Sequence, residues 1–150
     1  MSTSLLYHGF GIRGYRYVRT EYVEGGVVLT ITQDPKTCRC PACGGRNIIL
    51  KGGVTRRFRG LPIGGKKVTI VFHVPRIRCH DCNAVRQTPL GFADPRRTYT
   101  RSFAQYVLHL ARRMTIQDVA LHLGVSWDVV KEIVKSDLQR RFSNPKLKGL

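Results

Sequence analysis

The sequence predicts an α+β protein in which a β-rich first part is followed by a part of three helices. Three observations support this class: alternating apolar and polar residues before residue 80, two cysteine pairs in the same stretch, and helical periodicity after residue 97. At 150 residues the chain has the length of one ordinary domain or two small ones. The loop-like segment 83–97 contains two prolines, and we expect a boundary there that gives domains of 1–95 and 96–150.

The first expected element is a β-hairpin over residues 15–32, "YRYVRTEYVEGGVVLTIT". Apolar and polar residues alternate along it, and Glu24-Gly25-Gly26 supplies a turn in the middle. A hairpin alone is marginally stable, so it should pack on the residues that follow. Three further segments between residues 46 and 79 have strand character, and the glycine pairs 52–53 and 64–65 separate them.

Two CxxC pairs flank these segments, "CPAC" at residues 40–43 and "CHDC" at residues 79–82. Two residues between thiols let both sulfurs reach one metal ion, and four thiolates form the closed tetrahedral shell of structural Zn²⁺. The alternatives are a redox CxxC pair and unligated buried cysteines. The redox pair is disfavoured because two pairs occur and the flanks lack a βαβ pattern. The spacing therefore predicts a zinc ribbon in which structural Zn²⁺ is bound by Cys40, Cys43, Cys79 and Cys82.

Cys38 is the fifth cysteine, and an odd count argues against a framework of disulfides. Cys38 could replace Cys40 as a ligand, but four residues separate it from Cys43, which loses the tight knuckle geometry. We therefore expect Cys38 to be a free thiol. His80 lies inside the second knuckle, and we expect it to face solvent or phosphate and not the metal.

Helical periodicity begins after Thr100, the expected N-cap, with an apolar stripe that contains Phe103, Tyr106, Val107, Leu110 and Met114. A second helix is expected to begin at Thr115, with Asp118 in an approximate capping box, and to end at Gly124. Ser126 is expected to cap a third helix, whose inner residues would be Val129, Val130, Ile133, Val134 and Leu138. The residues after Ser143 are expected to form a linker.

Residues 116–134, "IQDVALHLGVSWDVVKEIV", match the requirements of a helix-turn-helix. The motif needs a small residue where its helices cross, here Ala120, and a residue that tolerates positive φ at the turn, here Gly124. It also needs an apolar inner face on its second helix, which lies in the major groove of DNA. We therefore expect DNA contacts from the outward-facing residues Ser126, Trp127, Asp128, Lys131, Glu132 and Lys135.

Two of these residues have a second interpretation. Asp128 could accept a hydrogen bond from a cytosine amine, or it could simply lie in the first helical turn, where the helix dipole favours an acid. Trp127 could pack on sugar or a thymine methyl group, or it could close the domain against the first helix.

The charge favours a polyanionic partner, because 26 Lys and Arg against 9 Asp and Glu give a formal net charge of +17. No acidic residue stands between Pro35 and His80. Such a charge attracts either nucleic acid or an anionic membrane surface. We expect double-stranded DNA as the partner, and neither a membrane nor a small-molecule substrate. No apolar run is long enough to span a bilayer, and the N-terminus has no secretory signal. The expected phosphate contacts are Arg56, Arg57, Arg59, Lys66, Lys67, Arg96, Arg97, Arg101, Arg112 and Arg113.

Five motifs, in the order "RCPACG", "RRFRGLPIGGKKV", "RIRCHDC", "GFADPRRTYTRSF" and "MTIQDVALHLGVSWDVVKEI", give the chain a family resemblance. It resembles the N-terminal part of a bacterial insertion-sequence transposase of the ISL-three family. In that family a zinc-binding domain and a helix-turn-helix precede a DDE catalytic domain that uses divalent metal ions. The resemblance implies binding of terminal inverted repeats during DNA transposition, dimerisation, and a place in the bacterial cytoplasm at the nucleoid.

The sequence ends at "NPKLKGL", about where the family's catalytic domain should begin, so the resemblance assigns no catalytic residue to this chain. We expect divalent catalytic metal ions only in that absent domain. The alternative interpretation is a free-standing, zinc-containing transcriptional regulator or a domesticated transposase remnant that binds its own DNA site.

Overall fold

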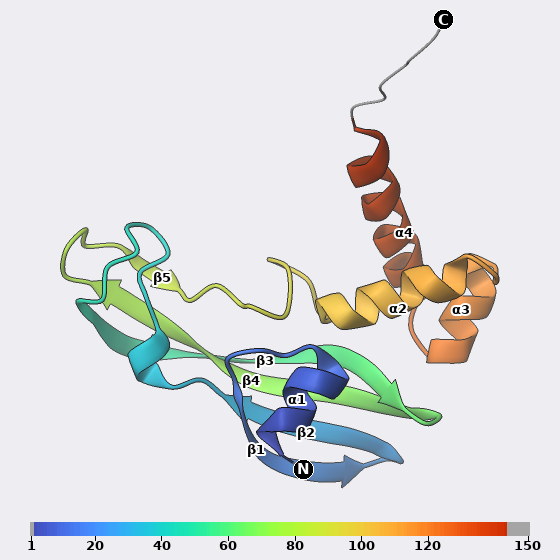
Figure 1. Ribbon diagram of the computed structural model, residues 1–150, viewed down its shortest axis with the longest axis horizontal. Coiled ribbons are helices and arrows are strands. Elements are labelled where there is room, and N and C mark those ends of the chain that lie inside the picture. The colour runs from blue at the N-terminus through green and yellow to red at the C-terminus, as the bar shows by residue number, and fades with distance from the viewer. Residues whose placement is uncertain (1, 144–150) are drawn as a thin grey trace, which may run out of the picture. The chain divides into compact units, whose positions relative to one another are not determined.

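The computed structural model describes residues 2–143, and its internal contacts divide the chain into two compact units, Met1–Phe103 and Ala104–Leu150 (Figure 1). The first unit contains the β-sheet and both cysteine pairs, and the second contains most of the helical part. The predicted linker after Ser143 lies outside the described residues. Between residues 2 and 143, no helix has both the length and the apolar character needed to cross a bilayer.

A single mixed sheet forms the first unit, and β4 is its central strand (Figure 1). The strand order is β1-β2-β4-β3, and β5 pairs with β4 beyond the reach of β2. Consequently β4 bonds to β3 along one edge and to β2 and then β5 along the other. The strands are β1 (Arg16–Val23), β2 (Gly26–Thr32), β3 (Ile48–Ile63), β4 (Lys66–Cys79) and β5 (Val85–Gln87).

The predicted N-terminal hairpin is confirmed as the antiparallel pair β1–β2. Glu24 and Gly25 at its turn both have positive φ, 49° and 73°. Positive φ at both central residues is the geometry of a type I′ turn, whose twist matches that of the flanking strands. The hairpin joins the rest of the sheet through β2, which runs parallel to β4 with Val27 opposite Val68.

The expectation that both glycine pairs separate strands is half wrong. Gly64 does lie in the turn between β3 and β4, with a φ of 58°. Gly52 and Gly53, however, lie within β3, where the register with β4 shifts between Leu50 and Gly53. The positive φ of Gly52, 74°, fits a β-bulge. A Cβ at Gly53 would clash with the Val74 carbonyl oxygen, so the close approach of β4 requires glycine.

An aromatic cluster forms the centre of the sheet's packed face. Phe92, from the loop after β5, makes edge-to-face contacts with Tyr15, Phe58 and Phe72 at centroid distances of 5.0, 5.1 and 6.1 Å. The Tyr15 hydroxyl accepts a hydrogen bond from the Gly91 N–H at 3.1 Å, which fixes this loop against the sheet. Segment 83–97 was expected to be loop-like, yet it contributes β5 and the core residues Phe92 and Ala93.

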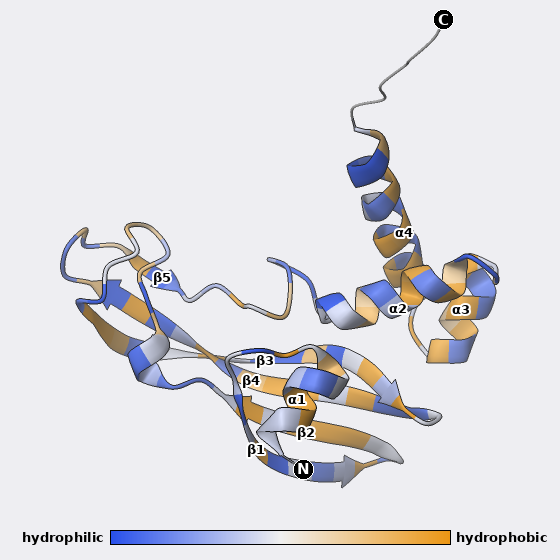
Figure 2. Ribbon diagram, in the orientation of Figure 1, coloured by the Kyte–Doolittle hydropathy of each residue, from blue (hydrophilic) through white to orange (hydrophobic). Residues whose placement is uncertain are grey.

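A short N-terminal helix, α1 (Thr3–Phe10), covers part of the same face, and the sequence analysis did not predict it. Ser2 caps it by accepting from the Leu5 N–H, and Gly11 ends it in the left-handed conformation. Leu6 and Phe10, one turn apart, are buried in the core. In Figure 2, β2 and β4 have the strongest hydrophobic colour of the sheet.

The three predicted helices are present as α2 (Arg101–Ala111), α3 (Ile116–Leu123) and α4 (Trp127–Phe142). Each begins at the predicted cap. Thr100 Oγ1 accepts from the Phe103 N–H at 3.1 Å, Thr115 Oγ1 from Asp118 at 3.1 Å, and Ser126 Oγ from Val129 at 3.4 Å. These hydroxyls satisfy amide groups that have no partner within the helix.

One inner residue of α4 was predicted incorrectly. Leu138 is 50% exposed, and Asp137 occupies the buried position instead. The cause is helical geometry, because Val130, Ile133 and Asp137 continue one stripe at spacings of three and four, while Leu138 lies beside it. Arg140 and Arg141 compensate the Asp137 carboxylate at 2.7 and 2.9 Å.

Phe92→Ala should lower the free energy of unfolding by roughly 3–5 kcal/mol, because it removes a buried ring from the centre of the aromatic cluster. Urea denaturation measures the change. Tyr22→Ala is the matched control, since Tyr22 on β1 is 81% exposed. The control should change stability by less than about 0.5 kcal/mol. Equal losses in both variants would contradict the described packing.

Candidate metal centre and nucleic-acid interface

The first cysteine knuckle is a tight turn closed by its own backbone. The Cys40 N–H donates to the Gly45 carbonyl at 3.0 Å, and the Gly44 N–H donates to the Cys40 carbonyl at 2.8 Å. Gly44 has a φ of 72°, which a residue with a Cβ adopts at a cost. The turn therefore directs both thiols of the knuckle to one side.

The second knuckle begins at Cys79, the last residue of β4. The Cys79 N–H donates to the Ala84 carbonyl at 2.9 Å, which closes this turn. The His80 N–H donates to the Asn47 carbonyl at 2.9 Å, so the second knuckle is bonded to the chain that follows the first. Backbone hydrogen bonds thus hold the two knuckles against each other, and the predicted pairs meet.

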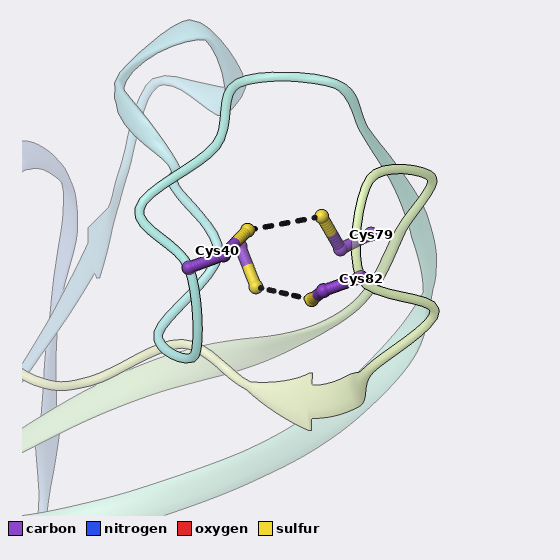
Figure 3. Close-up of side chains that lie close together, drawn as sticks. Cys40, Cys79 and Cys82 are labelled. Atoms are coloured by element: carbon purple, nitrogen blue, oxygen red, sulfur yellow. Dashed lines mark hydrogen bonds between the residues drawn. The ribbon is translucent and has the colours of Figure 1, made fainter.

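The four thiols form one cluster (Figure 3). Cys40 and Cys82 sulfurs lie 3.6 Å apart, those of Cys43 and Cys79 lie 3.5 Å apart, and all four are within 4.8 Å of one another. A disulfide would require about 2.05 Å. Tetrahedral zinc with Zn–S bonds of about 2.3 Å places its sulfurs about 3.8 Å apart. The arrangement therefore fits a four-cysteine site for structural Zn²⁺.

Ionisation of the cluster also fits a bound cation. Backbone N–H groups of Cys43 and Ala42 lower the pKa of Cys40 to about 6. For Cys43 the Gly45 N–H acts in the same direction, but the three neighbouring thiol groups outweigh it and raise the pKa of Cys43 to about 12. Four thiols this close cannot all ionise by themselves, and a divalent cation supplies the compensating charge.

Cys38 lies outside this cluster, as does His80. The Cys38 side chain is buried, and its sulfur lies 4.0 Å from the Asp34 carbonyl oxygen. Burial, and next the Asp34 charge, raise the pKa of Cys38, which favours the neutral thiol. Cys38 was expected to be a free thiol, and its position agrees with that expectation.

The turn between α3 and α4 has the geometry of a helix-turn-helix. Gly124 ends α3 with a φ of 62°, and its N–H and that of Val125 bond back to carbonyls of the last helical turn. Ala120 is 7% exposed, as the crossing of the two helices requires, and Val130 and Ile133 are buried. The predicted motif is confirmed.

Most of the predicted reading face is exposed. Asp128, Lys131 and Lys135 are accessible on α4, whereas Glu132 is half-buried and takes part in an interaction within the chain. Trp127 is 48% exposed, and the Lys131 ammonium lies 4.8 Å from its ring centroid. This cation–π contact holds Lys131 over the first turn of α4. The Ser126 hydroxyl is engaged as a cap.

Three of the arginines predicted to contact DNA have partners within the first unit. Arg56 lies 4.8 Å from the Phe58 ring centroid and donates to the Arg97 carbonyl at 3.0 Å. Arg59 lies 5.6 Å from the Phe103 ring centroid, and burial lowers its pKa. Arg101 donates to Asp94 at 2.7 Å. These side chains support the fold, and phosphate contacts by them stay a prediction.

The other predicted basic residues differ in exposure. Arg97 is half-buried and takes part in an interaction within the chain. Near the two hairpin turns, a shallow cavity of about 350 Å³ is lined by Arg57, Lys66 and Lys67. Exposed guanidiniums also lie before and after α2, at Arg96, Arg112 and Arg113. The structure thus leaves several cations accessible on each unit, and their contact with DNA stays a prediction.

Fold and site together define a zinc-ribbon protein with a helix-turn-helix of the DNA-binding class. Two family models match the sequence: the zinc-finger of transposase IS204/IS1001/IS1096/IS1165 over residues 36–82, and the helix-turn-helix domain of transposase family ISL3 over residues 88–137. The chain therefore contains the zinc-ribbon and helix-turn-helix domains of ISL3-family transposases, which implies DNA binding within a transposase. Searches of curated proteins and of solved structures found no match.

Removing zinc with a chelator should unfold the two knuckles and β5, because their own apolar cluster is small, with Cys40, Ile77 and Cys79 as its buried members. The aromatic core and α3–α4 should stay folded, because neither includes a cluster cysteine. Hydrogen exchange should show lost protection at residues 38–50 and 76–87, and retained protection at residues 66–74. Global unfolding, or no change, would contradict this division.

Cys43→Ser should have the same effect without a chelator, since it removes one of four thiolates. Cys38→Ser is the control, because Cys38 is buried near the site but lies outside the cluster. Metal analysis of the purified proteins should find zinc retained only in the control. Zinc loss in Cys38→Ser would show that the ligand set includes Cys38.

Proposed function

We propose that this chain is the DNA-recognition region of a DDE transposase and that it binds the terminal inverted repeats of an insertion sequence. The observation that carries the proposal is the exposed face of the N-terminal half of α4, which follows a helix-turn-helix turn in a segment matched by the ISL3 family. In such motifs the second helix enters the major groove with its first residues at base edges.

Lys131 and Lys135 lie one helical turn apart on the exposed side of α4. Lysine can donate to guanine edges, and Asp128 can accept from a cytosine amine. The contact with the Trp127 ring supports a role for Lys131 in base readout, because a side chain that is already positioned loses less entropy on binding. The exposed part of the Trp127 ring offers apolar surface to sugar or a thymine methyl group.

In this proposal zinc folds the protein and takes no part in chemistry. A shell of four thiolates leaves no open coordination position for water or substrate. Cys40, Cys43, Cys79 and Cys82 would hold the ion, and the cations on the sheet and around α2 would neutralise backbone phosphates. Strand cleavage and transfer would belong to the DDE domain of the family.

We further propose that two copies act together, one on each end of the element, at the nucleoid of the bacterial cytoplasm. We also propose a domain boundary near residue 95. It would separate a zinc-binding domain, residues 1–95, from a helix-turn-helix domain, residues 96–150. A footprint on the terminal repeat of the encoding element tests the function directly. Protection of the repeat is expected, and equal protection of unrelated duplex DNA would contradict it.

Lys131→Ala should cost roughly 1–3 kcal/mol of binding free energy on the specific repeat if Lys131 reads a base. Its effect on random duplex DNA should be much smaller, so the ratio of the two affinities should fall. Lys36→Ala, which removes an exposed cation outside the helix-turn-helix, should leave that ratio unchanged. Equal losses on both DNAs would assign Lys131 to a phosphate contact.

Affinity for duplex DNA should fall by roughly three decades or more between 50 and 200 mM salt if six or more phosphates are neutralised. The cause is the release of condensed counterions when cations of the protein replace them. Titrations at four salt concentrations measure the slope. A flat response would contradict a binding surface made from the exposed cations.

A further inference from the structure

A cavity of about 830 Å³ lies on the first unit, and all of its lining residues belong to that unit. Its wall comes from the first knuckle, from β3 and β4, and from the chain between β5 and α2. A second cavity of about 400 Å³ has Arg86 and Gln87 in common with it, so the two adjoin at β5. The pair forms one depression beside the zinc knuckle, called the β5 groove here.

Within the described part of the chain, no acidic residue lines the β5 groove; Asp94, which forms an ion pair with Arg101, is not among its lining residues. Four arginines line the larger cavity, Arg56, Arg86, Arg96 and Arg101. Lys51 and Arg76 extend the positive charge into the smaller one. A cluster of like charges destabilises the free protein unless an anion is bound there.

We propose that the β5 groove binds the phosphate backbone of duplex DNA, as a contact separate from the helix-turn-helix. The proposal deepens the proposed function and depends on it. Hydrogen bonds within the protein hold two of the lining arginines in place. Arg56 donates to the Arg97 carbonyl, and Arg101 donates to Asp94 and to the Gly91 carbonyl. Arg86 and Arg96 are exposed, and their side chains make no ion pair or hydrogen bond within residues 2–143.

Arg96 occupies a position that normally requires glycine. The Arg97 N–H donates to the Asp94 carbonyl at 3.2 Å and closes a turn with Pro95 second and Arg96 third. Arg96 has a φ of 63°, and a third residue with positive φ is the geometry of a type II turn, where glycine is strongly preferred. An arginine accepts this strain at the rim of the groove, and strained residues cluster at functional sites.

The lining also indicates which part of DNA is bound. No aromatic side chain lines either cavity, so bases have no surface on which to stack, and single-stranded DNA is disfavoured. Arginine forks match phosphate oxygens in geometry and charge. Thr88 adds a hydroxyl to the wall that is buried and has no hydrogen-bond partner among residues 2–143. These groups recognise phosphate and sugar without reading sequence.

The test compares the salt dependence of binding for the full chain and for Arg86→Gln/Arg96→Gln on a random duplex of about 30 base pairs. Each lost phosphate contact should lower the slope of log K against log salt by about 0.9, so the double variant should lose about 1.8. The charge-preserving variant Arg86→Lys/Arg96→Lys should restore most of the slope. The control Arg13→Gln/Lys36→Gln removes two exposed cations outside the groove and should keep the original slope.

Arg96→Gly is a control for misfolding, because glycine adopts the positive φ of this turn without strain. This variant should melt at a higher temperature than the parent and still lose about 0.9 of the slope. An unchanged slope in the groove variants, an equal loss in the control, or a loss on single strands alone would overturn the duplex groove while leaving the helix-turn-helix intact. If the parent protein bound no duplex at all, the proposed function would fail with it.

Discussion

The position of β4 at the centre of the sheet is the constraint on which the first unit depends. Its N-terminal half packs against the aromatic cluster and pairs with β2, and its last residue, Cys79, belongs to the zinc site. Hydrophobic packing and metal coordination therefore stabilise opposite ends of one strand. The β5 groove lies beside the metal end, so the zinc site holds in place the backbone that presents the arginines of the groove.

The second constraint is the excess of positive charge, which repels itself in the compact state. Two guanidiniums of the first unit are stabilised by contact with aromatic rings, Arg56 with Phe58 and Arg59 with Phe103. In α4, the buried carboxylate of Asp137 neutralises two arginines by forming ion pairs with them. Arg86 and Arg96 have side chains that the fold does not use, whereas Arg56 and Arg101 support the fold and also line the proposed β5 groove.

Local signals made much of this structure predictable. The cysteine spacing, the hairpin turn, Gly124 and the caps of the last three helices each depend on a few neighbouring residues, and all were confirmed. The parallel pairing of β2 with β4 was not predictable, because it joins segments with no local pattern in common. Arg86 was missed for a related reason, since only the paired β5 strand brings it beside Arg96. Helix α1 had a signal, with Ser2 before it and Gly11 after it, but it is short.

The parallel pairing of β2 with β4 also affects the order in which the sheet can form during synthesis. The hairpin β1–β2 leaves the ribosome first, with Leu29 and Ile31 on its apolar side, and its partner β4 begins only at Lys66. Until residues 33–65 have been made, that apolar side has α1 as its available cover, through Leu6 and Phe10. Before β4 is made, Leu6 and Phe10 of α1 can cover part of this apolar face, whereas the hydrogen-bonding edge of β2 has no partner.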